Sequence, residues 1–258
     1  MAPDFLLNEK MIQDLWLIGI GTGSPAHVTL EGMQALRDAS IILVPQKAAG
    51  KTDLAELRHR IIAASGTAAR IIGFDYPVRD PDLPYLERVN AWHDEIALRW
   101  QAALEGTPVP GPVALLVWGD PALFDSTLRI AERLTPRPKL LVVPGITAIQ
   151  ALTAAHAIPL NTINGAVEIT TGSRLRAHGW PRGATTVVVM LDGACSFKHL
   201  DPQGLMIWWG AFLGMPEQIL EHGALADVAG RIEARRTTAR AEHGWIMDIY
   251  LLRRTETA

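Results

Sequence analysis

Two glycine-containing segments hold residues that could bind a phosphate-bearing ligand. The first is "VPQKAAGKTDLAELRHR" (44–60), in which an apolar run leads into Gly-Lys-Thr and then a helix-like stretch. A phosphate-binding loop has this layout, with the pattern G-x-x-x-x-G-K-[ST]. Here Pro45 replaces the first glycine, and proline lacks both the N–H and the φ angle that let such a loop surround phosphates. In favour of a nucleotide hydrolase, Asp192 ends the run "VVVMLD" as the magnesium-binding acid does in those enzymes.

The second segment, "GIGTGSP" (19–25), resembles part of a dinucleotide-binding fingerprint. The pattern G-x-G-x-x-G requires a third glycine where this chain has Ser24, and Pro25 follows at once. The acidic residue that would bind the ribose is also missing, because the second apolar run ends in "VPQ" (44–46). The segment therefore does not by itself indicate NAD or FAD.

Both segments lie within an alternation of apolar runs and helix-like stretches. Apolar runs are expected to form strands in "DLWLIGIG", "IILVP", "ARIIGFDYPV", "PVALLVWGDP" and "PKLLVVPG", and helices lie between them, one of which spans about 84–104. Parallel strands need such helical crossovers. The runs are continuous Val, Leu and Ile, as in strands covered on both faces. The first half is predicted to be a parallel α/β sheet.

The pattern changes in the second half of the chain. "VEIT", "ATTVVVMLD", "LMIWW" and "WIMDIYLLRR" are expected strands, with less regular helices between them. Pro159 ends the preceding helix-like stretch, which places a junction near it. We therefore expect an N-terminal α/β domain over 14–158 with a parallel sheet and a C-terminal α/β domain over 161–254 with a mixed sheet.

The composition is that of a globular protein of 258 residues, with 48% hydrophobic and 20% charged residues. A net charge of -3 gives no indication of nucleic acid as a partner. The single Cys195 excludes an internal disulfide framework. No apolar run approaches the length of a membrane span, and the basic start of a signal peptide is missing, so no membrane association and a cytoplasmic location are expected.

Four segments together resemble the tetrapyrrole methylase family, from about Asp14 to Arg254. They are "LIGIGTGSPAHVTL", "LLVWGDPALFDS", "VVPGITAIQALTAAHAIPLN" and "WWGAFLGMPEQI". The resemblance implies two α/β domains with an active site in the cleft between them. It also implies methyl transfer from S-adenosylmethionine (SAM) to a tetrapyrrole.

Within the family the likeness is greatest to a deacetylating methylase of the oxygen-dependent route to cobalamin. It is carried by "LWLIGIGTGSP", "AWHDEIALRW", "WWGAFLGMPEQILEHG" and "EHGWIMDIYLLRR". Commoner members have proline where Thr22 stands and an acidic residue where Ser24 stands. These two departures concern the contacts of this loop and not the family. Another tetrapyrrole methylase of the same pathway is an alternative, and a nucleotide-binding protein that uses the 45–52 loop is the alternative from another class.

The resemblance implies a set of SAM-binding residues. SAM needs a partly apolar cleft with a few placed polar groups, and open α/β sheets bind ligands at the carboxyl ends of their strands. The positions that match the family's contacts are Thr22, Trp118, Gly119, Asp120, Leu123, Thr147, Ala148, Met190 and Leu213. Methyl transfer from a sulfonium requires no metal, so no metal is expected.

The tetrapyrrole implied by the resemblance carries many carboxylates, which cationic side chains would bind. Candidates near the carboxyl ends of strands are Lys47, Lys51, Arg79 and His93. Surface charge is the alternative for each, and a half-buried histidine with satisfied nitrogens is the alternative for His93. No catalytic base is identified, and the family is usually homodimeric, so a homodimer is expected.

Overall fold

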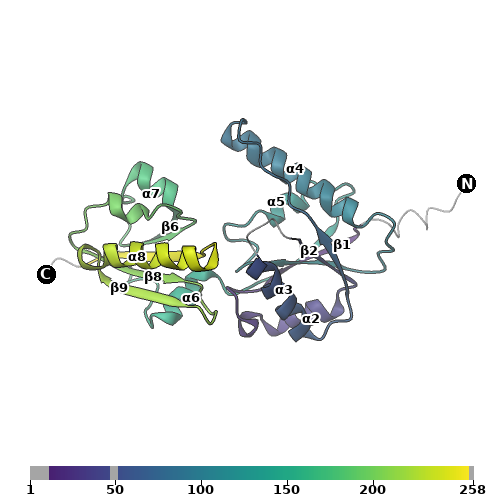
Figure 1. Cartoon of the computed structure of the whole chain (residues 1–258), viewed down its shortest axis with the longest axis horizontal. Coiled ribbons are helices and arrows are strands. Elements are labelled where there is room, and N and C mark those ends of the chain that lie inside the picture. The colour runs from purple at the N-terminus through teal and green to yellow at the C-terminus, as the bar shows by residue number, and fades with distance from the viewer. Residues whose placement is uncertain (1–11, 47–51, 256–258) are drawn as a thin grey trace, which may run out of the picture. The chain divides into compact units, whose positions relative to one another are not determined.

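The computed structural model describes residues 12–46 and 52–255, and it divides into two compact units (Figure 1). The N-terminal unit ends at Thr147 and the C-terminal unit begins at Ala148. This division lies before the junction expected near Pro159. The reason is that helix α6 (Ala148–Ala155) packs against strands β8 (Leu205–Ala211) and β10 (Asp248–Arg254) of the C-terminal unit.

The N-terminal unit is built on a five-stranded sheet in which every pairing is parallel, as predicted. Its strands run in the order β3-β2-β4-β1-β5. They are β1 (Asp14–Gly19), β2 (Ile41–Pro45), β3 (Arg70–Phe74), β4 (Val113–Val117) and β5 (Lys139–Val143). Every residue of β2 and β4 is buried, which explains their continuous apolar sequences.

Helices cover both faces of this sheet. One core layer joins β1 through Leu15 and Leu17 to α4 (Tyr85–Ala103) and α5 (Thr127–Ala131). The other joins β1 through Ile18 to α2 (Leu30–Asp38) and α3 (Thr52–Ser65). The 3-10 helix η1 (Pro25–His27) precedes α2. The alternation along β1 thus sends successive side chains to opposite helical layers.

The helix predicted over about 84–104 agrees with α4 at both ends, but most of its first turn is exposed. Leu86 continues the apolar spacing of α4 but is 72% exposed, because it lies in the first turn of the helix, where no residue is buried. Helix α5 is short and spans only Thr127–Ala131. The start of α2 follows the sequence more closely, since the hydroxyl of Thr29 accepts a hydrogen bond from the Gly32 amide at 3.0 Å.

The C-terminal unit contains a mixed sheet in the order β6-β7-β10-β8-β9. Only β6 (Val167–Thr171) and β7 (Thr186–Met190) pair in parallel, and the other pairings are antiparallel. The edge strand β9 (Ile219–Ala224) was not predicted. Its sequence "ILEHGA" lacks a continuous apolar run because an edge strand carries polar residues where an inner strand could not.

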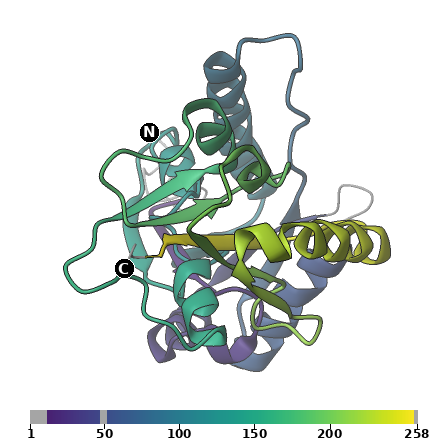
Figure 2. The same cartoon turned by 90° about the vertical axis from the view of Figure 1, so that its left-hand side faces the viewer.

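Helices α7 (Gly172–His178) and α8 (Leu225–His243) and the 3-10 helix η2 (Ser196–His199) complete this unit. Figure 2 shows α8 in yellow, lying against β8 and β9. Most of its polar residues are exposed, whereas Glu233 and Arg236 are half-buried. Among the described helices, none combines the length and the apolar character needed to cross a membrane.

Candidate ligand-binding site

The strand order creates a topological switch point at the carboxyl edge of the N-terminal sheet. From β1 the chain crosses β4 to reach β2, whereas from β4 it crosses β1 to reach β5. The connections after β1 and β4 therefore leave in opposite directions. In an open α/β sheet, a ligand binds outside the carboxyl ends of the strands at such a switch point. The segments at this edge are "GIGTG", "WGDP" and "PGIT".

Three glycines let the loops after β1, β4 and β5 approach one another closely. A Cβ atom on Gly145 would lie 2.0 Å from the carbonyl oxygen of Gly119, and one on Gly19 would lie 2.6 Å from the Gly145 amide. The Gly119 amide donates to the Gly21 carbonyl at 2.8 Å. Since backbone atoms are the neighbours, no side chain fits at Gly19 or Gly145.

Asp120 connects two of these loops through its carboxylate. One oxygen accepts a hydrogen bond from the Ala122 amide at 2.8 Å, and the other accepts one from the Gly145 amide at 3.0 Å. The carboxylate thus shapes its own turn and fixes the loop after β5.

Other predicted SAM-binding residues of the N-terminal unit lie beside these loops. Thr22 is buried, and its hydroxyl lies 3.0 Å from Nδ1 of His27. Trp118 is half-buried beneath the guanidinium of Arg58, which lies 5.0 Å from the centre of the indole. Sequence reasoning missed Arg58, because its position on α3 gives no signal of a stacking partner sixty positions away.

The segments after β4 and β5 contribute the remaining positions near this edge. The Leu123 amide donates to the Asp120 carbonyl at 3.2 Å, which places Leu123 in the same turn. Thr147 ends the N-terminal unit, and Ala148 begins α6. The side chains of Leu123, Thr147 and Ala148 are all half-buried.

Met190 and Leu213 belong to the C-terminal unit. Met190 is the last residue of β7 and is half-buried, so its side chain reaches the surface at the carboxyl end of that strand. Leu213 follows β8 and is 5% exposed. Its Cδ2 atom is 2.8 Å from where a Cβ on Gly210 would lie. The Leu213 side chain therefore packs within its own unit.

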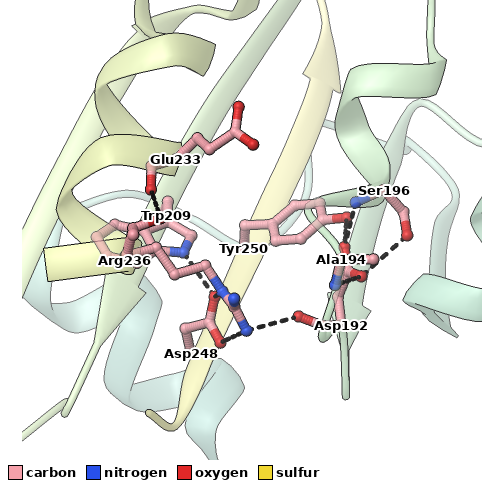
Figure 3. A network of polar contacts seen from close by, with 9 residues as sticks. Asp192, Ala194, Ser196, Trp209, Glu233, Arg236, Asp248 and Tyr250 are labelled. Carbon is pink, nitrogen blue, oxygen red and sulfur yellow. Dashed lines mark hydrogen bonds and ion pairs between the residues drawn. The ribbon is translucent and has the colours of Figure 1, made fainter. Parts of the chain in front are cut away.

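A buried carboxylate lies two residues beyond Met190 (Figure 3). Asp192 accepts hydrogen bonds from the amides of Ala194 at 3.0 Å and Ser196 at 2.6 Å, from the Ser196 hydroxyl at 2.9 Å and from the Tyr250 hydroxyl at 2.7 Å. Burial raises the pKa of this carboxyl, but the hydrogen bonds outweigh burial, and the net effect is a lowered pKa. Asp192 is therefore a charged structural anchor.

A second buried pair adjoins this anchor. The Arg236 guanidinium contacts the Asp248 carboxylate at 3.0 Å and also donates to the Asp192 carbonyl oxygen at 3.3 Å. The indole N–H of Trp209 donates to Asp248 at 3.0 Å. These bonds join β8, β10 and α8 to the segment after β7 (Figure 3).

The predicted substrate-binding residues have different surroundings. Lys47 and Lys51 lie outside the described residues. Arg79 is exposed, with its guanidinium 4.1 Å from the centre of the Trp92 ring. His93 is only 3% exposed, so its ring is more deeply buried than the half-buried histidine given as the alternative.

The His93 ring also lacks the expected hydrogen bonds. Neither ring nitrogen has a hydrogen-bond partner in the described part of the chain. Burial, followed by the positive charges of Arg133, Arg129 and Arg79, lowers the pKa of His93 and keeps the imidazole neutral. Sequence reasoning missed this burial because a histidine beside an apolar helical stripe can face either way.

The arrangement does not support a nucleotide hydrolase. Pro45 ends β2 in the N-terminal sheet, whereas Asp192 follows β7 in the C-terminal sheet. The carboxylate oxygens of Asp192 already accept four hydrogen bonds. Asp192, the acid expected to bind magnesium, thus lies in a different sheet from Pro45. Its carboxylate is also already occupied by hydrogen-bond donors.

Comparison with known protein families shows which class of protein this chain, with its two α/β units, belongs to. The model of the family described as Tetrapyrrole (Corrin/Porphyrin) Methylases matches residues 14–229. The chain belongs to this family, whose members are methyltransferases that use SAM. The family prediction made from the four sequence segments is confirmed.

Two individual proteins are similar to this chain over nearly its full length. A "Precorrin-6A synthase [deacetylating]" from Sinorhizobium sp. is 44% identical over 256 residues, covering 96% of this chain and 98% of the relative. The crystal structure of a protein related to cobalamin synthesis (CobF) from Corynebacterium diphtheriae has a TM-score of 0.81 and 38% identity, covering 95% of this chain and all of that one.

A third protein, with a lower sequence identity, resembles this chain in its fold only. It is the uroporphyrin-III C-methyl transferase from Thermus thermophilus in complex with S-adenosylhomocysteine. Its TM-score is 0.58 at 18% identity, and the match covers 93% of this chain and 91% of that one.

Proposed function

We propose that this protein is the SAM-dependent methyltransferase that methylates precorrin-5 at C-1 and releases acetate to give precorrin-6A. The observation that carries the proposal is the 44% identity to a deacetylating precorrin-6A synthase along nearly the full length of both chains. The similar CobF structure supports it, because that likeness also extends over 95% of this chain.

The chemistry of the step places modest demands on the protein. When bound, SAM supplies an electrophilic methyl group on its sulfonium sulfur. A nucleophilic ring carbon of the tetrapyrrole forms a bond to this methyl as the carbon–sulfur bond breaks, and S-adenosylhomocysteine leaves. The ring acetyl group then departs as acetate after addition of water. Because the methyl donor is already activated, the chain contributes mainly by positioning its substrates.

The carboxyl edge of the N-terminal sheet suits such a role. Gly19 and Gly145 pack backbone to backbone against Gly119, which brings the loops after β1, β4 and β5 together at this edge. We assign SAM binding to this edge and to the end of β7, through Thr22, Trp118, Gly119, Asp120, Leu123, Thr147, Ala148, Met190 and the backbone of Leu213. Asp120 would act by holding the loops after β4 and β5 in place.

The tetrapyrrole carboxylates would be bound by Lys47, Lys51 and Arg79. His93 is left out because its ring is buried. The family resemblance further supports a homodimer located in the cytoplasm, with no nucleic acid or membrane partner.

Mass spectrometry of the tetrapyrrole product tests the proposal. The purified protein is incubated with precorrin-5 and SAM that carries an isotope-labelled methyl group. We expect the product to gain one labelled methyl and to lose one acetyl, with acetate appearing in equal amount. Methyl gain with the acetyl retained would assign the protein to another methylation of the pathway, and no methyl gain would refute a methyltransferase of this substrate.

A further inference from the structure

Leu191, directly after Met190, combines two features that are unfavourable in a folded protein. Its backbone is in the left-handed region, with a φ of 53°, although it is not glycine. Its apolar side chain is 68% exposed. A glycine or asparagine at this position would relieve the backbone and remove the exposed apolar group. The presence of leucine therefore indicates a use for this side chain.

The buried anchor at Asp192 holds Leu191 in this conformation. Four hydrogen bonds to the Asp192 carboxylate, one of them from Tyr250 on β10, fix the backbone immediately after Leu191. Gly172 packs on the same carboxylate, since a Cβ there would lie 2.3 Å from an Asp192 oxygen. The surroundings thus determine the backbone at Leu191 and leave its side chain facing outward.

Strained residues recur beside the positions assigned to SAM. Phe124, with a φ of 49°, follows Leu123, and Phe212, with a φ of 51°, precedes Leu213. Residues in sparsely populated backbone regions cluster at ligand sites, where the rest of the fold compensates their cost. Leu191 follows this pattern beside Met190.

We infer that Leu191 forms an apolar contact with bound SAM and that Asp192 is the positioning residue that presents it. This inference rests on the proposed function. A leucine side chain offers no hydrogen bond, so its partner must be an apolar surface of the ligand, such as the adenine ring or the methionine chain. Ligand sites of this kind combine apolar walls with a few polar groups.

Calorimetry with S-adenosylhomocysteine and Leu191→Gly separates a ligand contact from a structural role. We expect the variant to bind with a Kd about tenfold higher, since burying a leucine side chain is worth at least about a factor of ten. Its melting temperature should be unchanged or higher, because glycine adopts a positive φ freely. Loss of affinity without loss of stability is the expected signature.

Two further variants serve as controls for Leu191→Gly. Ala157→Gly changes another exposed residue with a φ of 52°, and it should leave the Kd within about twofold of wild type. Leu191→Met retains the apolar side chain and should restore most of the affinity. If Leu191→Gly binds S-adenosylhomocysteine as tightly as wild type does, the inference is overturned.

The role of Asp192 is tested by the kinetics of Asp192→Asn. We expect the KM for SAM to rise severalfold while the KM for the tetrapyrrole changes little; an equal change in both would overturn a positioning role toward SAM. An active wild type with an unaffected Leu191→Gly would refute only this inference. A wild type that binds no S-adenosylhomocysteine and transfers no methyl would refute the proposed function and this inference together.

Discussion

Replacing Tyr250 by Phe isolates one hydrogen bond of the Asp192 anchor. Tyr250 is 1% exposed, and its hydroxyl donates to the Asp192 carboxylate at 2.7 Å. The substitution retains the ring, which packs edge-on against Phe197 at 5.2 Å, and leaves Asp192 with three donors. Because a hydrogen bond to a charged group contributes about 1.5–3 kcal/mol, we expect the free energy of unfolding to fall by about 2 kcal/mol at neutral pH.

The pH dependence of this loss follows from the lowered pKa of Asp192. A carboxyl whose pKa is lower in the folded than in the unfolded state stabilises the fold above the unfolded value of about 3.9. That contribution is lost as pH falls through the folded-state pKa. Tyr250→Phe removes one cause of the lowered pKa, so the difference between variant and wild type should shrink in acid.

Urea unfolding followed by tryptophan fluorescence measures both effects, at neutral pH and below about pH 4. Tyr85→Phe is the matched control, because Tyr85 is 68% exposed and its variant should stay within about 0.5 kcal/mol of wild type. A loss below about 0.5 kcal/mol for Tyr250→Phe at neutral pH, or an equal loss at both pH values, would refute the reasoning.

Two further substitutions test the strand edge and the buried histidine. Gly145→Ala would place a Cβ 2.0 Å from the Gly119 carbonyl oxygen, so calorimetry should show a Kd for S-adenosylhomocysteine that is at least about tenfold higher. Gly230→Ala is the control, because Gly230 has no crowding neighbour and its variant should bind with an unchanged Kd. His93→Leu removes a buried imidazole without partners among the described residues and should raise the free energy of unfolding by about 1 kcal/mol at neutral pH. Urea unfolding should show a larger gain in the free energy of unfolding near pH 5. Because the pKa of His93 is lower in the folded than in the unfolded state, the unfolded state takes up the proton first as pH falls, and wild type loses stability below about pH 6.5. An unchanged Kd for Gly145→Ala, or a His93→Leu protein less stable than wild type at both pH values, would contradict these arguments.

The sequence by itself determined the local structure of the first half and the identity of the family. Continuous apolar runs predicted the buried strands of the parallel sheet, and the "GIGTG", "WGDP" and "PGIT" segments placed candidate residues at their carboxyl ends. These features could be predicted because they depend on neighbouring residues: side-chain periodicity, glycine and proline at turns, and motifs short enough to lie within one loop.

Only the tertiary structure decided which of these residues meet. The Asp120 carboxylate reaches the Gly145 amide because β4 and β5 both lie next to β1 in the sheet. The periodicity of the sequence does not encode this strand order. Tyr250 reaches Asp192 because β10 pairs with β7, although 58 positions separate the two residues. The strained backbone of Leu191 and the burial of His93 likewise depend on packing. The physical reason is that strand order and register bring distant residues together, whereas a sequence pattern reports only which face of its own element a side chain occupies.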